Sequence, residues 1–303
     1  MLQIIGIVLP IFAVIGLGQV AVRWHAFDGA AAGNLTKFVV YFPIPALTFG
    51  VIAEARPASV MAFSLAYLAG AVVIYLLGLA VTGLFEHPSL GHRAVFALDA
   101  VWSNLVFLGT PLISAVWGIE GLTYLVGIIV ATSAFMPISV ALMEIDMSPK
   151  RGSDIVGGVL ISLAKNPIIV STILGLVWRL AALPVPMPLH MLIDLLGRCA
   201  APMGLFCLGM SLPPMTREVI REAALCTCLK LLVMPAVVGV ICYLAGFTGM
   251  PLSIAILAAA MPTGPNAFII ARSTTRFGDS SATSVVLATL LSIITLPVLL
   301  YLM

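Results

Sequence analysis

Charged residues are scarce in this chain. Only 9% of its 303 residues are Asp, Glu, Lys or Arg, whereas 62% are hydrophobic and the mean hydropathy is +1.20. A soluble protein could not bury that much apolar surface, so the composition excludes a soluble domain and indicates a protein whose main partner is the lipid bilayer. The formal net charge of +2 gives no reason to expect nucleic acid as a partner.

Motifs for covalent or metal chemistry are also missing. The five cysteines all fall in apolar stretches, where Cys packs as a small side chain, so we expect no disulfide framework. Cys226 and Cys228 are one residue short of a CxxC arrangement, and no nearby His completes a metal set. The sequence has no HExxH, no paired catalytic carboxylates at membrane depth and no ATP-binding loop. We therefore expect that the protein is not an enzyme and has no catalytic residue, metal or cofactor. Without an ATP-binding loop, the energy for its activity should come from gradients.

Long apolar runs dominate what is present. A helix of roughly 20 apolar residues crosses a hydrocarbon core about 30 Å thick. The runs here are continuous and lack the alternation of a barrel strand, so helices are required. We predict an all-α membrane protein with ten transmembrane spans, at residues 3–22, 35–53, 59–84, 94–117, 122–143, 166–182, 190–212, 223–246, 251–271 and 281–302.

The second half of the chain repeats landmarks of the first. Four of them recur 157 positions later, because Pro10, Gly18, Pro45 and Phe49 return as Pro167, Gly175, Pro202 and Phe206. Each half holds five predicted spans, and an odd number makes the second copy insert upside down. We therefore predict two inverted five-helix repeats, 1–143 and 166–303, joined by a cytoplasmic connection at 144–165, which is typical of secondary transporters.

Basic residues in the connections predict the orientation. One side receives only Arg56 and Arg179. The other side receives eight basic residues, which are Arg23, Arg93, Lys150, Arg151, Arg217, Arg221, Arg272 and Arg276. Positive residues stay in the cytoplasm, so we expect a multi-pass protein of the cytoplasmic (inner) membrane with both termini on the outer side. The sequence leaves a homodimer open.

Two predicted spans are interrupted by proline, and the residues around these interruptions are the candidate substrate-binding site. They are Asn104, Gly109, Thr110 and Pro111 in the fourth span and Pro262, Thr263, Gly264, Pro265 and Asn266 in the ninth. Proline removes the hydrogen bond to the carbonyl four residues back, so Phe107, Ala258 and Met261 should have freed carbonyls. Such backbone is tolerated at membrane depth only against protein or a wet cavity. The two segments are therefore predicted to cross inside the bundle.

The chemistry of such a crossing suits an anion. A helix that restarts at the midplane has an N-terminus with about half a positive charge, and its N–H groups point outward. Asn104 and Asn266 would add donors without placing a full charge in hydrocarbon. Interruptions at corresponding places in both halves indicate a binding site. The alternative is that the prolines only kink the helices and that Asn joins neighbouring helices, a contact worth about 1 kcal/mol.

Other polar residues in the spans have simpler alternatives. Asp99 lies about one turn inside the fourth span, where a carboxylate tends to be functional, so it is a candidate site for a coupling proton or Na+. Alternatively, Asp99 caps that helix at the cytoplasmic boundary close to Arg93. Lys230, about two turns into the eighth span, is expected to extend back toward the cytoplasmic surface, with a role at the substrate as the secondary alternative. Asp194 and Arg198 are spaced to form their own ion pair.

Three segments carry a resemblance to a known family: Lys165–Pro167, Ala200–Phe206 and Ala259–Phe268. In order and spacing they resemble the auxin efflux carrier family, across essentially the whole chain. Bacterial members of that family include proteins regarded as malonate transporters. The resemblance implies a scaffold of spans 1, 2, 6 and 7 and a moving transport domain of spans 3 to 5 and 8 to 10. It also implies that Asn104 and Asn266 hold a carboxylate where the broken helices cross.

These observations predict a secondary transporter of small organic anions, with malonate as the leading candidate, that works by alternating access around the crossing of spans 4 and 9. An internal negative potential of 100 mV opposes entry of each anionic charge by about 2.3 kcal/mol, so concentrative uptake of a dianion needs cotransported H+ or Na+. The alternatives are a sodium-coupled symporter of the bile-acid type and an anion channel. Paired inverted repeats with interrupted helices favour a carrier.

Overall fold

Helices make up almost all of the chain. The structure is a computed structural model that describes residues 2–27, 29–54, 60–84, 89–147, 161, 164–210, 217–274 and 278–303. Within these ranges the only β-structure is one isolated antiparallel bridge. The predicted all-α class is confirmed. Much of the predicted connection at 144–165 lies outside the described residues, as do Arg56, Lys150, Arg151 and Arg276.

The helices of the two halves are described in chain order. Those of the first half are α1 (Leu2–Arg23), α2 (Gly29–Tyr41), α3 (Pro43–Glu54), α4 (Met61–Val81), the 3-10 turn η2 (Thr82–Leu84), α5 (Leu90–Val101), the π-helical turn η3 (Leu105–Gly109), α6 (Thr110–Thr132) and α7 (Phe135–Met147). Those of the second half are α9 (Pro167–Leu180), α10 (Met187–Met210), α11 (Arg217–Cys228), the π-helical turn η4 (Leu229–Val233), α12 (Met234–Leu244), α13 (Met250–Ala260), α14 (Pro265–Thr274) and α15 (Gly278–Leu302).

The described helices are those of a multi-pass membrane protein. Six stretches are long and apolar enough to cross a bilayer: Ala31–Glu54, Met61–Val81, Glu120–Met147, Met187–Met210, Val219–Leu244 and Gly278–Leu302. Three shorter apolar helices are Ala13–Arg23, Pro167–Leu180 and Met250–Ala260. These nine overlap nine of the ten predicted spans, and the interrupted α5–η3–α6 region occupies the place of the fourth. The number of crossings stays a prediction.

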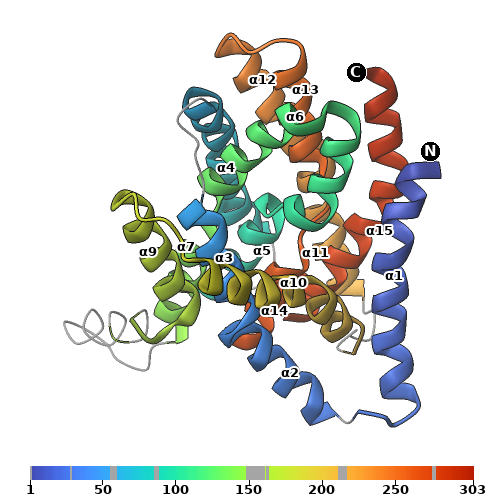
Figure 1. Cartoon of the computed structure of the whole chain (residues 1–303). Coiled ribbons are helices and arrows are strands. Elements are labelled where there is room, and N and C mark those ends of the chain that lie inside the picture. The colour runs from blue at the N-terminus through green and yellow to red at the C-terminus, as the bar shows by residue number, and fades with distance from the viewer. Residues whose placement is uncertain are drawn as a thin grey trace.

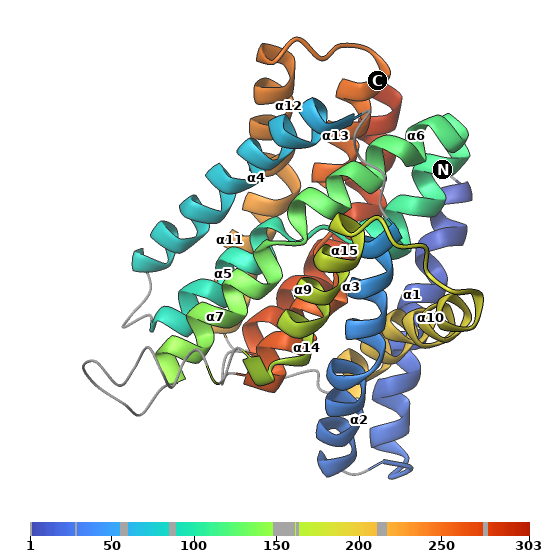
Figure 2. The ribbon, with the colours of Figure 1, turned by 60° about the vertical axis from the view of Figure 1, so that its left-hand side comes forward.

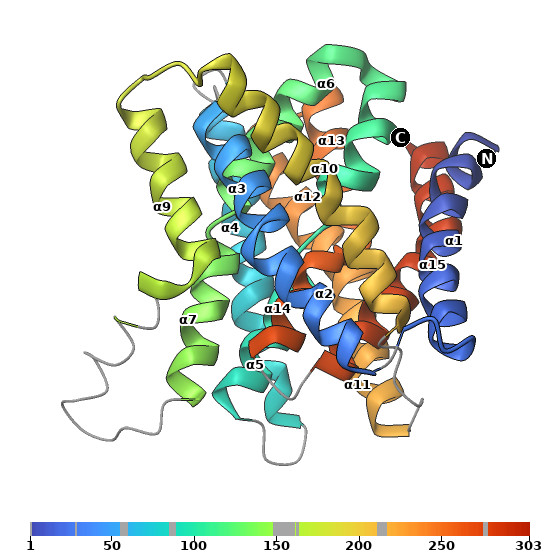
Figure 3. The same cartoon turned by 60° about the horizontal axis from the view of Figure 1, so that its bottom comes forward.

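Two groups of helices pack mainly among themselves. The first group is α1, α2, α3, α9 and α10, and Figure 3 shows α2, α3 and α10 next to one another on the face turned toward the viewer. The second group is α4 to α7 with α11 to α15. Helix α14 also contacts α2 and α10 of the first group. Both chain termini lie at the same end of the molecule (Figures 1 and 2).

Glycine permits close backbone contact in two helix pairs, each of which joins a helix of the first half to a helix of the second half. A Cβ on Gly18 of α1 would collide with the carbonyl oxygen of Phe206 in α10. A Cβ on Gly175 of α9 would lie 3.2 Å from the carbonyl oxygen of Phe49 in α3. Small residues allow such close backbone approach in membrane helices. The four residues are two of the matched pairs of the predicted repeat, so each half supplies one glycine and one phenylalanine.

Bulky apolar side chains on the outer faces agree with a lipid environment. Leu195 and Ile294 are 68% and 66% exposed, as expected of side chains that face hydrocarbon. The predicted ion pair on α10 is confirmed, because Arg198 Nη2 lies 2.8 Å from Asp194 Oδ2. The pair satisfies both charges within one helix and needs no ligand.

Candidate functional site

The helix of the predicted fourth span is broken at Trp102–Asn104. Helix α5 ends at Val101, and the π-helical turn η3 starts at Leu105 and continues into α6. The prediction that Pro111 makes the break is wrong, because the helix is interrupted at Trp102–Asn104. Pro111 lies in the first turn of α6, where a missing N–H removes little.

The helix of the predicted ninth span is broken at Met261–Gly264, where the prolines predict it. Helix α13 ends at Ala260, Pro262 lies in the non-helical segment, and Pro265 is the first residue of α14. Proline suits the first helical position because its fixed φ is already helical and its N–H would have no partner there. The second break therefore follows from its own sequence.

The two broken helices cross as a short antiparallel pair. The Asn104 N–H donates to the Pro262 carbonyl at 2.8 Å, and the Gly264 N–H donates to the Trp102 carbonyl at 2.9 Å. Each break thus satisfies backbone groups of the other, which is the condition for non-helical backbone at membrane depth.

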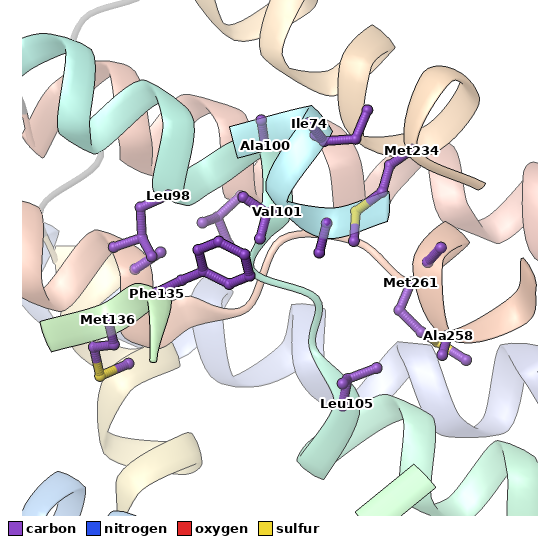
Figure 4. Packing of buried hydrophobic residues seen from close by; sticks show 14 of the residues in the cluster. Ile74, Leu98, Ala100, Val101, Leu105, Phe135, Met136, Met234, Ala258 and Met261 are labelled. Carbon is purple, nitrogen blue, oxygen red and sulfur yellow. The ribbon is translucent and has the colours of Figure 1, made fainter. Parts of the chain in front are cut away.

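Close packing surrounds this crossing. A Cβ on Gly264 would lie 3.0 Å from Cδ1 of Trp102, so glycine allows the two segments to approach. Figure 4 shows Phe135 and Met136 of α7 on one side of the crossing and Met234 of α12 on the other. The crossing lies inside the helix bundle, as the sequence predicts.

Buried side chains satisfy carbonyls at the ends of α5 and α13. Thr263 Oγ1 donates to the Asp99 carbonyl at 2.9 Å. Lys230 Nζ donates to the Ala259 carbonyl at 2.8 Å and to Ser103 Oγ at 2.6 Å. The last carbonyls of a helix have no partner within it, so these contacts replace missing hydrogen bonds.

The position of Lys230 corrects a prediction. Its side chain is completely buried at the crossing and does not extend to the surface of the molecule. The π-helical turn η4 carries Lys230, and such turns are frequent at functional sites. The crossing offers Lys230 two oxygen acceptors, and Met234 Sδ, four residues further along the chain, lies 3.0 Å from Nζ. Sequence reasoning missed this role because the two oxygen acceptors come from distant parts of the chain.

A cavity of about 70 Å³ lies beside the crossing, between α3 and the broken helices. Its polar lining is Thr48, Ser103, Asn104, Thr132, Ser133 and Asn266. Asn104 and Asn266 are 4% and 7% exposed, and their side-chain oxygens have no hydrogen-bond partner among the described residues. Buried polar atoms are nearly always paired, so two unpaired amide oxygens on residues of a cavity wall indicate groups that can bind a ligand.

The remaining candidate site residues are divided between the cavity wall and the crossing. Gly264 and Pro265 line the cavity, whereas Pro262 and Thr263 are buried in the crossing and do not. Gly109 is buried, and its N–H donates to the Asn104 carbonyl at 3.0 Å. Thr110 and Pro111 begin α6, and their side chains lie outside what the structure describes.

Asp99 lies near the C-terminal end of α5 and does not line the cavity. The side chain is 2% exposed, and its Oδ1 accepts a hydrogen bond from Ser281 Oγ at 2.8 Å. The alternative that Asp99 caps this helix is wrong, because Ser89 holds the N-cap position and accepts from the His92 N–H.

A second, partly buried polar group lies next to Asp99 along α15. Ser280 Oγ donates to Glu222 Oε2 at 2.5 Å, and His92 Nε2 lies 3.2 Å from the same oxygen. Ser280 and Ser281 are adjacent, so α15 connects Glu222 to Asp99. No local spacing pattern predicts this group, because its members come from three separate helices.

The family is decided by comparison with known proteins. A family model described as membrane transport protein matches residues 3–300, which is nearly the whole chain. The chain belongs to this family. Members of the membrane transport protein family move solutes across membranes, so the protein is a transporter and not an enzyme.

Individual relatives cover almost the full length of the chain. A protein of Rhizobium meliloti (strain 1021) named "Putative malonate transporter" is 27% identical over 100% of this chain and 96% of its own length. The "Uncharacterized transporter YfdV" of Escherichia coli (strain K12) is 26% identical over 98% and 96%. The "Auxin efflux carrier component 5" of Arabidopsis thaliana is 24% identical over 98% and 95%. The predicted resemblance to auxin efflux carriers is confirmed.

Proposed function

We propose that this protein is a secondary transporter that moves small carboxylates across the cytoplasmic (inner) membrane by alternating access. The observation that carries the proposal is the pair of buried amides of Asn104 and Asn266, which line one cavity where two broken helices restart and whose side-chain oxygens have no hydrogen-bond partner among the described residues. Asn104 precedes η3, and Asn266 is the second residue of α14. Helix N-termini favour negative charge and present backbone N–H groups, so a carboxylate fits this end of the cavity.

The proposed architecture has ten spans arranged as two inverted five-helix repeats, 1–143 and 166–303. Three observations support it: the two breaks that pair with each other, the exchange of glycine and phenylalanine partners between halves, and termini at one end of the molecule (Figure 1). The orientation with both termini outside rests on the excess of basic residues in the predicted cytoplasmic connections.

Movement of one helix group against the other would open the site to alternate sides. Helices α1, α2, α3, α9 and α10 would form the scaffold, and the remaining helices would form the transport domain. The cavity has Leu47, Thr48 and Ile52 of α3 on one wall and the crossing on the other. A site at such an interface changes its access when the transport domain rocks, as in other carriers with inverted repeats.

Malonate is the leading named substrate because a full-length relative carries that name. A transport assay with purified protein in proteoliposomes tests the proposal against a panel of mono- and dicarboxylates. Protein-dependent flux of at least one is expected, and its complete absence would reject the function. Sodium-stimulated binding would favour a symporter of the bile-acid type, and single-channel currents would favour an anion channel.

The role of the two Asn residues is tested by ligand-induced thermal shift. A ligand that binds only the folded protein raises its unfolding temperature. We expect the shift in the parent protein to disappear in Asn104→Ala and in Asn266→Ala. The matched control is Asn34→Ala, because Asn34 is exposed on α2. Equal shifts in all four proteins would remove both residues from the site.

Asp99 is the proposed coupling site for H+ or Na+. It is buried and its carboxylate is paired with the hydroxyl of Ser281, beside the polar group around Glu222. Ionisable residues at this depth commonly mark ion pathways. Asp99→Asn should abolish cation-dependent accumulation of the carboxylate and leave carboxylate exchange intact. Unchanged coupling in this variant would exclude the role.

A further inference from the structure

The walls of the cavity contain hydrogen-bonding groups but no formal charge. None of its fifteen lining residues, all within the described part of the chain, is Asp, Glu, Lys, Arg or His. Most of the wall is apolar, formed chiefly by Leu47, Ile52, Leu105, Val106, Ile129 and Met136. The cavity therefore differs from a site built for a molecule with two charged ends.

The polar groups of the wall serve one end of a ligand. Thr132 Oγ1 donates to the Ile128 carbonyl at 2.8 Å, and Ser133 Oγ donates to the Val130 carbonyl at 2.7 Å. Both hydroxyl hydrogens are therefore donated to backbone carbonyls of the preceding turn and are not available to a ligand. The side-chain oxygens of Asn104 and Asn266 have no hydrogen-bond partner among the described residues, and the NH2 groups of the same amides are donors for a carboxylate. One carboxylate can accept from these donors, and a second would face a wall that is apolar apart from the hydroxyl of Thr48.

The basic side chain of Lys230 supports the same end of the cavity. Lys230 Nζ does not line the cavity but donates to Ser103 Oγ, which does. The site thus has one ammonium behind the amide end and no cation in the opposite wall. An ionised carboxylate buried without a partner is strongly disfavoured, and such a group tends to become neutral.

We propose that this site accepts singly charged carboxylates, and that it takes a dicarboxylate such as malonate only as the half-protonated monoanion. The inference rests on the proposed function, because it specifies the ligand of that same cavity. The carboxylate lies at the Asn104 and Asn266 end, and a short apolar or neutral polar group lies against α3 and α7.

The size of the cavity limits the ligand as well. A cavity of about 70 Å³ offers room for roughly five to seven water-sized groups, at about 10–15 Å³ for each. Propionate, butyrate and hydrogen malonate are of this size, whereas carboxylates with a fused aromatic ring are much larger. A monoanion also needs half the electrical work that a dianion needs to enter against an internal negative potential.

The decisive experiment compares malonate with malonamate, which has the same shape but carries only one negative charge. Dissociation constants are measured with the purified full-length protein by calorimetry over a pH series through the second pKa of malonate. We expect malonamate binding to stay constant. Malonate binding should weaken by about tenfold for each pH unit above that pKa, in step with the loss of the monoanion.

A variant with an added positive charge tests whether the missing cation in the apolar wall is what disfavours the dianion. Met136→Lys places an ammonium on a side chain of similar length in the apolar wall, and Met136→Leu is the uncharged control. We expect Met136→Lys to bind the malonate dianion at least about tenfold more tightly than the parent protein, and Met136→Leu to keep the parent preference. Thr48→Lys is the second variant if Met136→Lys does not fold.

The outcomes separate the two proposals. Malonate binding by the parent protein that is independent of pH, or stronger above the second pKa, would overturn the inference about charge and leave carboxylate transport standing. Failure of malonate, malonamate and butyrate to bind at any pH would overturn the proposed function itself.

Discussion

The two broken helices meet at the same point but are broken for different reasons. The segment Met261–Gly264 has Pro262 inside it and Pro265 directly after it. The segment Trp102–Asn104 contains neither proline nor glycine, and its backbone is held open by hydrogen bonds to the other segment. The second break is therefore encoded locally, whereas the first depends on its partner.

The helix ends at the two breaks also differ in the charge of the side chain that donates a hydrogen bond to them. The Asp99 carbonyl at the end of α5 accepts from the neutral hydroxyl of Thr263, whereas the Ala259 carbonyl at the end of α13 accepts from the ammonium of Lys230. Hydrogen bonds from charged donors are about twice as strong as neutral ones. Substitutions at the two ends should therefore differ in size, and in the case of Lys230 also in sign.

The largest effect on transport is expected from Lys230→Met. The substitution removes the contacts to Ser103 and Ala259 that join the two segments. A hydrogen bond from a charged group contributes about 1.5–3 kcal/mol, so we expect carboxylate uptake to fall by roughly 10- to 100-fold. The measurement is initial uptake rate in proteoliposomes at matched protein density.

Stability should respond to Lys230→Met in the opposite direction. The ammonium is fully buried and has no ion-pair partner within the described residues, and apolar replacement of buried charge is often neutral or stabilising. We expect the unfolding temperature without ligand to stay constant or rise. A clear fall in unfolding temperature would show that Lys230 acts mainly as a structural link.

Gly264→Ala is expected to have the next largest effect. Its Cβ would lie 3.0 Å from Cδ1 and 3.3 Å from Nε1 of Trp102, so the crossing has to widen. Overpacking of this kind costs about 1–3 kcal/mol, which should lower the unfolding temperature and weaken ligand binding. The control is Gly109→Ala, where the closest atoms to a Cβ lie 3.7 Å away. Equal effects of both substitutions would contradict the close approach at Gly264.

The difference between the breaks explains how far the sequence could predict them. Pro262 and Pro265 predict the end of α13 and the start of α14, because proline acts through its own ring and missing N–H. Pro111 suggested the wrong place for the first break, since a proline in the first turn of a helix is tolerated. The true break at Trp102–Asn104 is stabilised by hydrogen bonds to a segment far away in the sequence, and no local sequence pattern predicts such bonds.

The candidate site shows the same limit. Asn104 and Asn266 could be selected from the sequence because an amide beside an interrupted helix is unusual within an apolar span. The position of the Lys230 ammonium could not be predicted, because a lysine two turns inside a membrane can also extend its four-carbon side chain so that the ammonium reaches the surface. Its actual acceptors, Ser103 and the Ala259 carbonyl, belong to other elements and become neighbours only in the folded protein.

The smallest effect is expected from Thr263→Val, which changes the helix end whose carbonyl accepts from a neutral hydroxyl. This nearly isosteric change removes the hydroxyl that donates to the Asp99 carbonyl and leaves the backbone pairing of the two segments in place. We expect a loss of about 1 kcal/mol in the free energy of unfolding and less than about a tenfold loss in ligand affinity. Chemical denaturation and calorimetry measure the two quantities.

Thr289→Val is the control for Thr263→Val. The Thr289 hydroxyl donates to the Val285 carbonyl four residues back in its own helix, α15, so its removal leaves no helix end without a partner. The two threonines are both almost fully buried, at 1% and 2% exposure, so burial alone predicts equal effects. A larger loss in Thr263→Val than in Thr289→Val would therefore measure what the cross-segment hydrogen bond adds. Equal losses would mean that the crossing is held by its backbone pairing and by Lys230 alone.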